Sequence, residues 1–141
     1  MKYLLDTCVI SELIKKKPDN NVIECLSKLN ELNIFISVLT IGEIHKGISK
    51  INDSERKNSL LNWVNNDLVK RFENRIIDLD LSILIKWGQV NGEYEKKGVK
   101  LPVIDSLLVS TCLINNMIFV TRNVDDIKIL ECKYLNPWVK I

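Results

Sequence analysis

The chain has 141 residues, of which 46% are apolar and 27% are charged, and its formal net charge is +2. These values fit one globular domain over residues 1–141 and exclude binding to nucleic acid through overall charge alone. Any such contact needs a local cluster of basic residues.

The cysteines and the single histidine limit the possible metal sites and compartments. Four cysteines are scattered along the chain, and none forms a C-x-x-C pair. With His45 as the one histidine, the usual zinc sites are excluded. Free thiols are typical of a reducing compartment, and no apolar run reaches the ~18 residues of a membrane span. We therefore expect a cytoplasmic protein without a secretory signal or membrane contact.

The first half of the chain alternates strand and helix patterns. In chain order, the predicted elements are a strand at residues 3–5, a helix at 8–14, a helix capped by Asn20 or Asn21 and reaching 29, a strand at 33–37, a helix from Thr40 and a long helix from Asp53 to 68. Three lysines at residues 15–17 close the first helix. They are either a solvated helix end or a contact for RNA.

The second half continues the alternation. The predicted elements are a strand at residues 75–78, a helix at 81–94 capped by Asp80 and ended near a left-handed Gly98, a helix at 101–111, a strand at 117–120, a short helix at 127–130 and an edge strand at 134–135. Strands that alternate with helices indicate an α/β fold with a central parallel sheet of four to five strands flanked by helices.

Acidic residues gather at the ends of these elements. Asp6 directly follows the first strand, and Asn123 and Asp126 follow the fourth. Glu43 and Asp105 stand near the starts of helices. Because the carboxyl ends of parallel strands meet at one edge of a sheet, we expect these side chains to face the same crevice.

Each acid also has a purely structural explanation. Asp6 is suited to cap the helix that follows it, and Asp105 to the positive end of a helix dipole. Thr40 and Glu43 match the capping box, in which the glutamate binds the N–H of the cap residue. For Glu43, the capping role and a metal-ligand role both stay open, and the two are not exclusive.

Taken together, the acids indicate a bound cation. Carboxylates a few ångströms apart repel one another and destabilise the fold unless a positive charge lies between them. Mg²⁺ or Mn²⁺ suits such oxygen donors and activates water for attack on a phosphodiester, with either one or two ions. The sequence therefore predicts a metal-dependent hydrolytic site.

Four segments resemble, in order, the motifs of PIN-domain ribonucleases of the VapC toxin type. Residues 5–13, LDTCVISEL, are similar to their opening L-D-T-x-V-[IL]-S-E, and residues 37–47, SVLTIGEIHKG, to S-x-x-T-x-x-E-[LI]-x-x-G. Residues 104–108, which contain Asp105, and residues 120–126 are similar to the third and fourth motifs. The closing Asn136-Pro137-Trp138 is similar to the tail of FitB-like members. The resemblance spans the whole chain.

The resemblance implies a PIN fold and a Mg²⁺- or Mn²⁺-dependent endoribonuclease. The implied metal ligands are Asp6, Glu43 and Asp105, and the implied catalytic set adds Asn123 and Asp126. Because Asn123 stands where some members carry aspartate, the choice between Asn123 and Asp126 for the fourth position stays open. Cys8 also departs from the family, which commonly has asparagine there.

The candidate contacts for RNA phosphates are Arg122, Thr121 and Lys46, with Ser106 as a further hydroxyl donor. The toxin subgroup also implies a homodimer and a VapB-type antitoxin. Trp63 and Trp87 would serve either those interfaces or the core.

Three other classes of protein compete with the interpretation as a toxin nuclease. A signalling receiver domain needs a pair of acids at the first strand and a lysine after the last one, whereas this chain has Asp6 alone and Thr121-Arg122. A PIN module without catalytic activity and a PIN nuclease for RNA maturation both remain alternatives. Loss of cleavage in EDTA identifies the enzyme, and growth arrest on expression identifies the toxin.

Overall fold

The computed structural model describes residues 1–140, whose strands form a sheet in the order β3-β2-β1-β4-β5. The strands are β1 (Lys2–Leu5), β2 (Ile34–Ser37), β3 (Ile76–Ile77), β4 (Met117–Val120) and β5 (Tyr134–Leu135). All four neighbouring pairs are parallel. The prediction of an α/β fold with a parallel sheet of four to five strands is confirmed.

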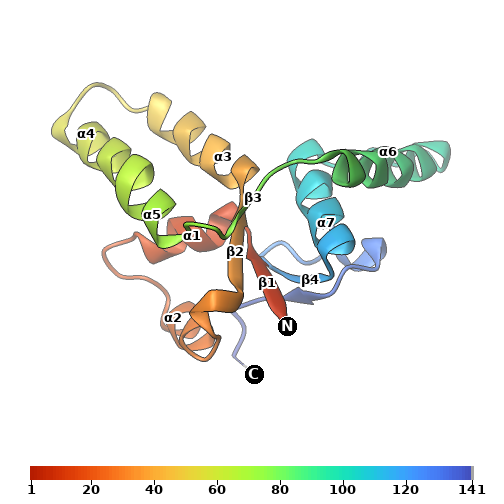
Figure 1. Cartoon of the computed structure of the whole chain (residues 1–141), viewed down its shortest axis with the longest axis horizontal. Helices are drawn as coiled ribbons and strands as arrows, with labels where there is room; N and C mark the ends of the chain where they lie inside the picture. The colour runs from red at the N-terminus through yellow and green to blue at the C-terminus, as the bar shows by residue number, and fades with distance from the viewer. Residues whose placement is uncertain (141) are drawn as a thin grey trace.

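Helices cover both faces of this sheet. The α-helices are α1 (Thr7–Leu13), α2 (Asn20–Ser27), α3 (Val38–Ser49), α4 (Glu55–Asn62), α5 (Val69–Arg71), α6 (Leu81–Lys96) and α7 (Val103–Asn115). The 3₁₀ helices are η1 (Glu31–Asn33) and η3 (Lys128–Leu130), and η2 (Trp63–Leu68) is a π-helix. In Figure 1, α3 to α5 and α6 to α7 extend to opposite sides of the central strands. No helix within residues 1–140 is long and apolar enough to cross a membrane.

The two faces of the sheet bury separate hydrophobic clusters. Leu5 and Val120 belong to the cluster formed with α1 to α3 and η2, whereas Leu4 and Phe119 belong to the cluster formed with α7. Strands of a parallel sheet are covered on both faces and are therefore apolar at consecutive positions. This is why residues 3–5 and 117–120 read as short, continuous apolar runs.

The strand order places the end of β1 at the reversal point of the sheet. From β1 the chain proceeds outward to β2 and β3, and it then returns to β4 on the other side of β1. In open α/β sheets, ligands bind outside the carboxyl ends of the strands at this point. Asp6 and Thr121 directly follow β1 and β4, so the fold places both residues there.

Helix α3 begins earlier than the capping-box pattern predicts. Its cap is Ser37, the last residue of β2, whose hydroxyl accepts a hydrogen bond of 3.0 Å from the N–H of Leu39. Thr40 lies inside the helix and is fully buried. The capping-box interpretation of Thr40 and Glu43 was wrong, because the strand runs directly into the helix without a loop.

Several other boundaries differ in detail from the prediction. The cap of α2 is Asp19, and the strand predicted at residues 75–78 is only Ile76–Ile77. The long helix predicted from Asp53 changes to π-helical geometry at Trp63–Leu68. The cap at Asp80 and the left-handed conformation of Gly98, with φ of 79°, are confirmed.

Candidate active site

Asp6 is held in one orientation by hydrogen bonds to both carboxylate oxygens. As the N-cap of α1, it accepts a bond of 2.7 Å at Oδ1 from the N–H of Thr7. At Oδ2 it accepts a bond of 2.8 Å from the hydroxyl of Thr121, which is fully buried after β4. The site thus begins as a link between the ends of the two adjacent strands β1 and β4.

Glu43 joins this site through α1. The hydroxyl of Thr7 donates to Oε1 of Glu43 at 2.6 Å and also lies 3.4 Å from the hydroxyl of Thr40. Glu43 therefore faces the start of α1 and not the cap of its own helix. This orientation brings the second acidic segment to the same edge of the sheet as Asp6.

Asp105 lies in the first turn of α7, where the positive end of the helix dipole favours a carboxylate. Even so, burial raises the pKa of Asp105, and the negative charges of Asp6, Glu43 and Asp126 raise it further. Three acids from distant parts of the sequence therefore act electrostatically on Asp105. That these side chains face one crevice stays a prediction.

The fourth segment supplies a linked pair. The side-chain amide of Asn123 donates to Oδ2 of Asp126 at 3.0 Å, and its backbone N–H donates to the hydroxyl of Thr121 at 3.2 Å. Because Asp126 contributes to the raised pKa of Asp105, its charge is directed at the acidic site. Asn123 is thus a hydrogen-bond donor to that acid.

The four acids carry charge that the protein itself does not neutralise. Within residues 1–140, none of Asp6, Glu43, Asp105 and Asp126 forms an ion pair. Within the same residues, no three His, Cys, Asp or Glu side chains are already close enough to hold a metal ion. The donor set is one of hard carboxylate oxygens that fits a divalent cation with several waters, not a closed protein cage.

Basic and apolar side chains line the approach to Glu43. A cavity of about 300 Å³ is lined by Val38, Leu39, Gly42, Glu43, Lys46 and Ile104. Lys46 is exposed on α3, three residues after Glu43, and Arg122 is exposed directly after Thr121. Lys46 thus shares a cavity wall with Glu43, and Arg122 follows the residue that binds Asp6.

Two hydroxyl groups proposed as phosphate donors have other partners. Thr121 is fully buried and donates to Asp6. Ser106 is 1% exposed, donates to the carbonyl of Val103 and accepts from the indole N–H of Trp87, each at 3.0 Å. The phosphate-contact interpretation of Thr121 and Ser106 is therefore not supported, because each hydroxyl is already bound inside the protein.

Two residues next to Asp6 complete the site and were not predicted to act there. One is Thr7, described above. The other is Cys8, whose thiol donates to Oδ2 of Asp6 at 3.6 Å. Burial and the charge of Asp6 raise the pKa of Cys8 to about 11, so it stays a neutral thiol. Both residues were visible in the first motif, but only the folded contacts reveal their partners.

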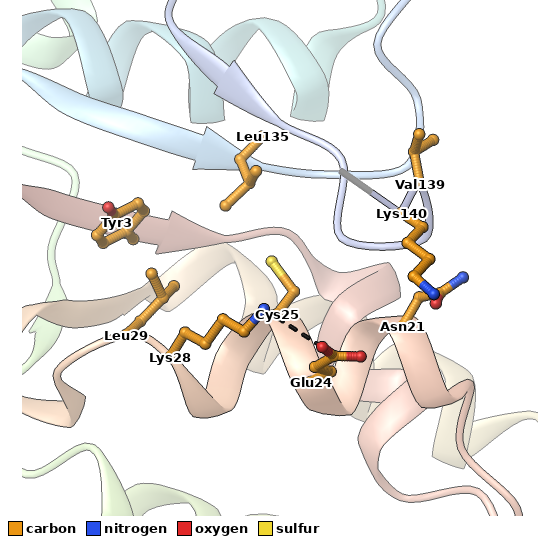
Figure 2. A pocket seen from close by; sticks show the side chains of 9 residues that line it. All are labelled: Tyr3, Asn21, Glu24, Cys25, Lys28, Leu29, Leu135, Val139 and Lys140. Carbon is orange, nitrogen blue, oxygen red and sulfur yellow. Dashed lines mark hydrogen bonds and ion pairs between the residues drawn. The ribbon is translucent and has the colours of Figure 1, made fainter.

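A second cavity of about 300 Å³ lies away from the acids (Figure 2). Its lining comes from β1, α2, β5 and the C-terminal segment and includes Tyr3, Cys25, Leu29, Leu135 and Val139. Lys28 and Glu24 form an ion pair of 3.3 Å along α2 at its edge. No acidic residue of the proposed site lines it, so it is separate from the hydrolytic centre.

Comparison with known proteins identifies the class to which this fold and site belong. The family model described as "PIN domain" matches residues 3–129. A solved structure of FitAB bound to a DNA fragment has a TM-score of 0.90 at 24% identity, covering 99% of this chain and 97% of that one. The chain belongs to the PIN-domain family.

Two curated relatives narrow the assignment. Ribonuclease VapC2 of Rickettsia felis is 32% identical over an alignment of 142 positions that covers 99% of this chain and 100% of the relative. Toxin FitB of Neisseria gonorrhoeae is 24% identical over 135 residues, or 96% and 97% of the two chains. Within the PIN domains, the protein is a member of the VapC-type ribonuclease toxins.

Proposed function

We propose that this protein is a metal-dependent endoribonuclease that hydrolyses RNA phosphodiester bonds as the toxin of a VapBC-type pair. The observation that carries the proposal is the set of four carboxylates around the ends of β1 and β4, which form no ion pair within residues 1–140 and of which three, Asp6, Glu43 and Asp126, raise the pKa of the fourth, Asp105. We also propose that residues 1–141 form one PIN domain, since the family model matches residues 3–129.

The cation is Mg²⁺ or Mn²⁺, held by Asp6, Glu43 and Asp105. Bound there, it supplies a polarised water and offsets the charge that develops on the phosphate. Thr121 and Thr7 fix the orientations of Asp6 and Glu43, and the remaining lone pairs of these two carboxylates would be available to the cation. Positioning of this kind by neighbouring groups is general for metal ligands.

Asp126 is the fourth acid of the proposed site, and Asn123 positions it. The amide of Asn123 occupies one oxygen of Asp126, which leaves the other available for water. Arg122 and Lys46 bind the phosphates that flank the scissile bond, because both are exposed cations beside the acids.

The test of the catalytic assignment is Asp6→Asn. The purified variant is expected to keep its fold and to lose RNA cleavage, and EDTA is expected to abolish cleavage by the wild-type protein until Mg²⁺ or Mn²⁺ is restored. Cleavage by a well-folded Asp6→Asn at the wild-type rate would show that the assignment is wrong.

The toxin assignment implies two protein partners. FitB is named a toxin and is solved as FitAB on DNA, and we propose a small VapB-type antitoxin for this chain by analogy. A second copy is the other partner, since Leu81, Leu84 and Ile85 expose an apolar face of α6. Because its substrate is cellular RNA, we place the protein in the cytoplasm. Growth arrest on expression, relieved by the gene product encoded beside it, separates a toxin from a nuclease for RNA maturation.

A further inference from the structure

A buried carboxylate lies on α1 outside the acidic site. The side chain of Glu12 is only 7% exposed. It accepts hydrogen bonds from Nζ of Lys15 at 3.0 Å, from the N–H of Asp19 at 3.2 Å and from the indole N–H of Trp138 at 3.3 Å. The bond from Lys15 is the main reason why the pKa of Glu12 lies below its usual range. Glu12 is therefore a charged anchor for Trp138.

The main chain of Trp138 is fixed as well. Its N–H donates to Oδ1 of Asn136 at 3.0 Å, and its carbonyl accepts from the side-chain amide of Asn21 at 3.1 Å. Asn21 lies on α2 and Glu12 on α1. The indole ring is thus held from two helices and from its own turn, although it has no part in the hydrolytic chemistry.

Arg122 lies on this ring. Its guanidinium carbon is 5.2 Å from the centre of the Trp138 ring, within the range of a cation–π contact. The neighbouring residue Thr121 touches Asp6, and two aspartates follow at positions 125 and 126. Even so, within residues 1–140 Arg122 forms no ion pair with any carboxylate.

The contact with Trp138 keeps Arg122 from competing with a cation for the nearby carboxylate oxygens. An arginine free to rotate beside several carboxylates pairs with them, which would occupy oxygens that a cation needs. A guanidinium stacked by its face on a ring keeps the N–H groups at its edge open to a planar or tetrahedral anion. Since Lys15 already balances Glu12, the charge of Arg122 is not cancelled by the anchor.

We propose that Trp138, anchored by Glu12, is a positioning residue that keeps Arg122 off the acidic site and presents it to a phosphate of single-stranded RNA. The inference rests on the proposed nuclease function. It gives a role in RNA binding to Trp138 of the C-terminal Asn-Pro-Trp segment and to Glu12 of the first motif. It acts on RNA binding through Arg122 and not on the hydrolytic step.

The experiment measures RNA binding over a range of salt concentrations with full-length Asp6→Asn, which does not cleave the probe, a single-stranded oligouridylate. Arg122→Ala is expected to reduce the slope of log K against log[salt] by ~0.7, the value for one phosphate of a single strand. Trp138→Leu is expected to reduce the slope toward the same value and to raise Kd roughly two- to fivefold, the factor that a lost cation–π contact accounts for.

Two further variants separate positioning from general stability. Tyr94→Leu removes a comparable stack, that of Lys97 on Tyr94 at 5.3 Å, and is expected to leave the slope unchanged. Trp138→Phe keeps a ring but loses the bond to Glu12, and is expected to give an intermediate slope. If Trp138→Leu does not fold, the slope of Trp138→Phe is compared with that of the parent instead.

The double variant Arg122→Ala/Trp138→Leu is expected to bind RNA no more weakly than Arg122→Ala alone. Additive losses, or a folded Trp138→Leu with the parent slope and Kd, would overturn the inference while leaving the nuclease assignment intact. Absence of RNA binding by the parent, together with absence of cleavage by the wild type, would contradict both the inference and the nuclease assignment.

Discussion

The hydroxyl of Thr7 donates a hydrogen bond of 2.6 Å to Oε1 of Glu43 and so ties the first residue of α1 to the middle of α3. The two residues are 36 positions apart in the chain. The contact fixes Glu43 toward Asp6, because the main-chain N–H of the same threonine binds Asp6.

Replacing Thr7 therefore tests the alignment of two acids at once. Thr7→Val keeps the shape of the side chain and removes the donor, and we expect roughly a 10- to 100-fold loss of cleavage rate or metal affinity, as for other groups that orient metal ligands. Thr7→Ser retains the hydroxyl and is expected to stay near the wild-type rate. Equal cleavage rates for Thr7→Val and wild type, at both saturating and limiting Mg²⁺, would show that Thr7 does not align the acids.

The raised pKa of Asp105 makes the free energy of unfolding depend on pH. Because the pKa of Asp105 is raised in the folded state, the folded protein holds more protons than the unfolded chain between the ordinary value near 3.8 and the raised one. Stability therefore falls as pH rises through that interval. In EDTA, Asp105→Asn is expected to unfold at a higher temperature than wild type at neutral pH, and this difference is expected to vanish below the interval.

Thermal unfolding followed by circular dichroism from acidic to neutral pH measures this difference. Asp78→Asn is the matched control, since Asp78 is an exposed aspartate outside the acidic site. Added Mg²⁺ is expected to raise the unfolding temperature of wild type more than that of Asp105→Asn. If Asp105→Asn were the less stable protein in EDTA at neutral pH, the electrostatic account of the site would be wrong.

The cap of α3 gives a prediction about stability alone. Ser37→Ala removes the acceptor for the N–H of Leu39 and is expected to lower the free energy of unfolding by about 1 kcal/mol, whereas Ser37→Gly is expected to cost only a few tenths. Urea unfolding of the three proteins makes the comparison. A fully stable Ser37→Ala would contradict the assignment of this cap.

The exposed face of α6 gives a prediction about assembly. Leu84 and Ile85 are 44% and 51% exposed, and Leu81 is 74% exposed on the same helix. If this face joins two copies, the double substitution Leu84→Glu/Ile85→Glu is expected to convert the dimer to a monomer in sedimentation velocity. The matched control is Ile23→Glu, which places a charge on the 44% exposed Ile23 of α2. A wild-type monomer, or a dimer that survives the α6 substitutions, would contradict the dimer proposal for this face.

Most of the fold could be predicted from local patterns. Apolar runs identified all five strands, and Asp80 and Gly98 marked the ends of α6, because capping and left-handed positions depend on nearby residues. The cap of α3 was not predicted. Ser37 is both the last residue of β2 and the cap of the helix, and the capping-box pattern at Thr40 and Glu43 gives no sign of this double role. The π-helical turn at Trp63–Leu68 has no local signature in the sequence.

The acids of the proposed site could be predicted from the sequence, but the contacts that orient them could not. Asp6, Glu43 and Asp105 were found because acids at element ends of an α/β fold meet at one edge. Pairings such as Thr121 with Asp6 and Trp138 with Glu12 join residues 115 and 126 positions apart. No spacing rule connects such distant positions, so only the packed chain reveals them.

The pairing of β1 with β4 has a consequence for synthesis. β1 leaves the ribosome first, but Val120 and Thr121, which bind Asp6 through its main chain and side chain, are made only near the end of translation. Until then the first acid has no fixed orientation and the fourth segment does not exist. We therefore expect a nascent or prematurely terminated chain to be inert, because the proposed centre can form only in a nearly finished polypeptide.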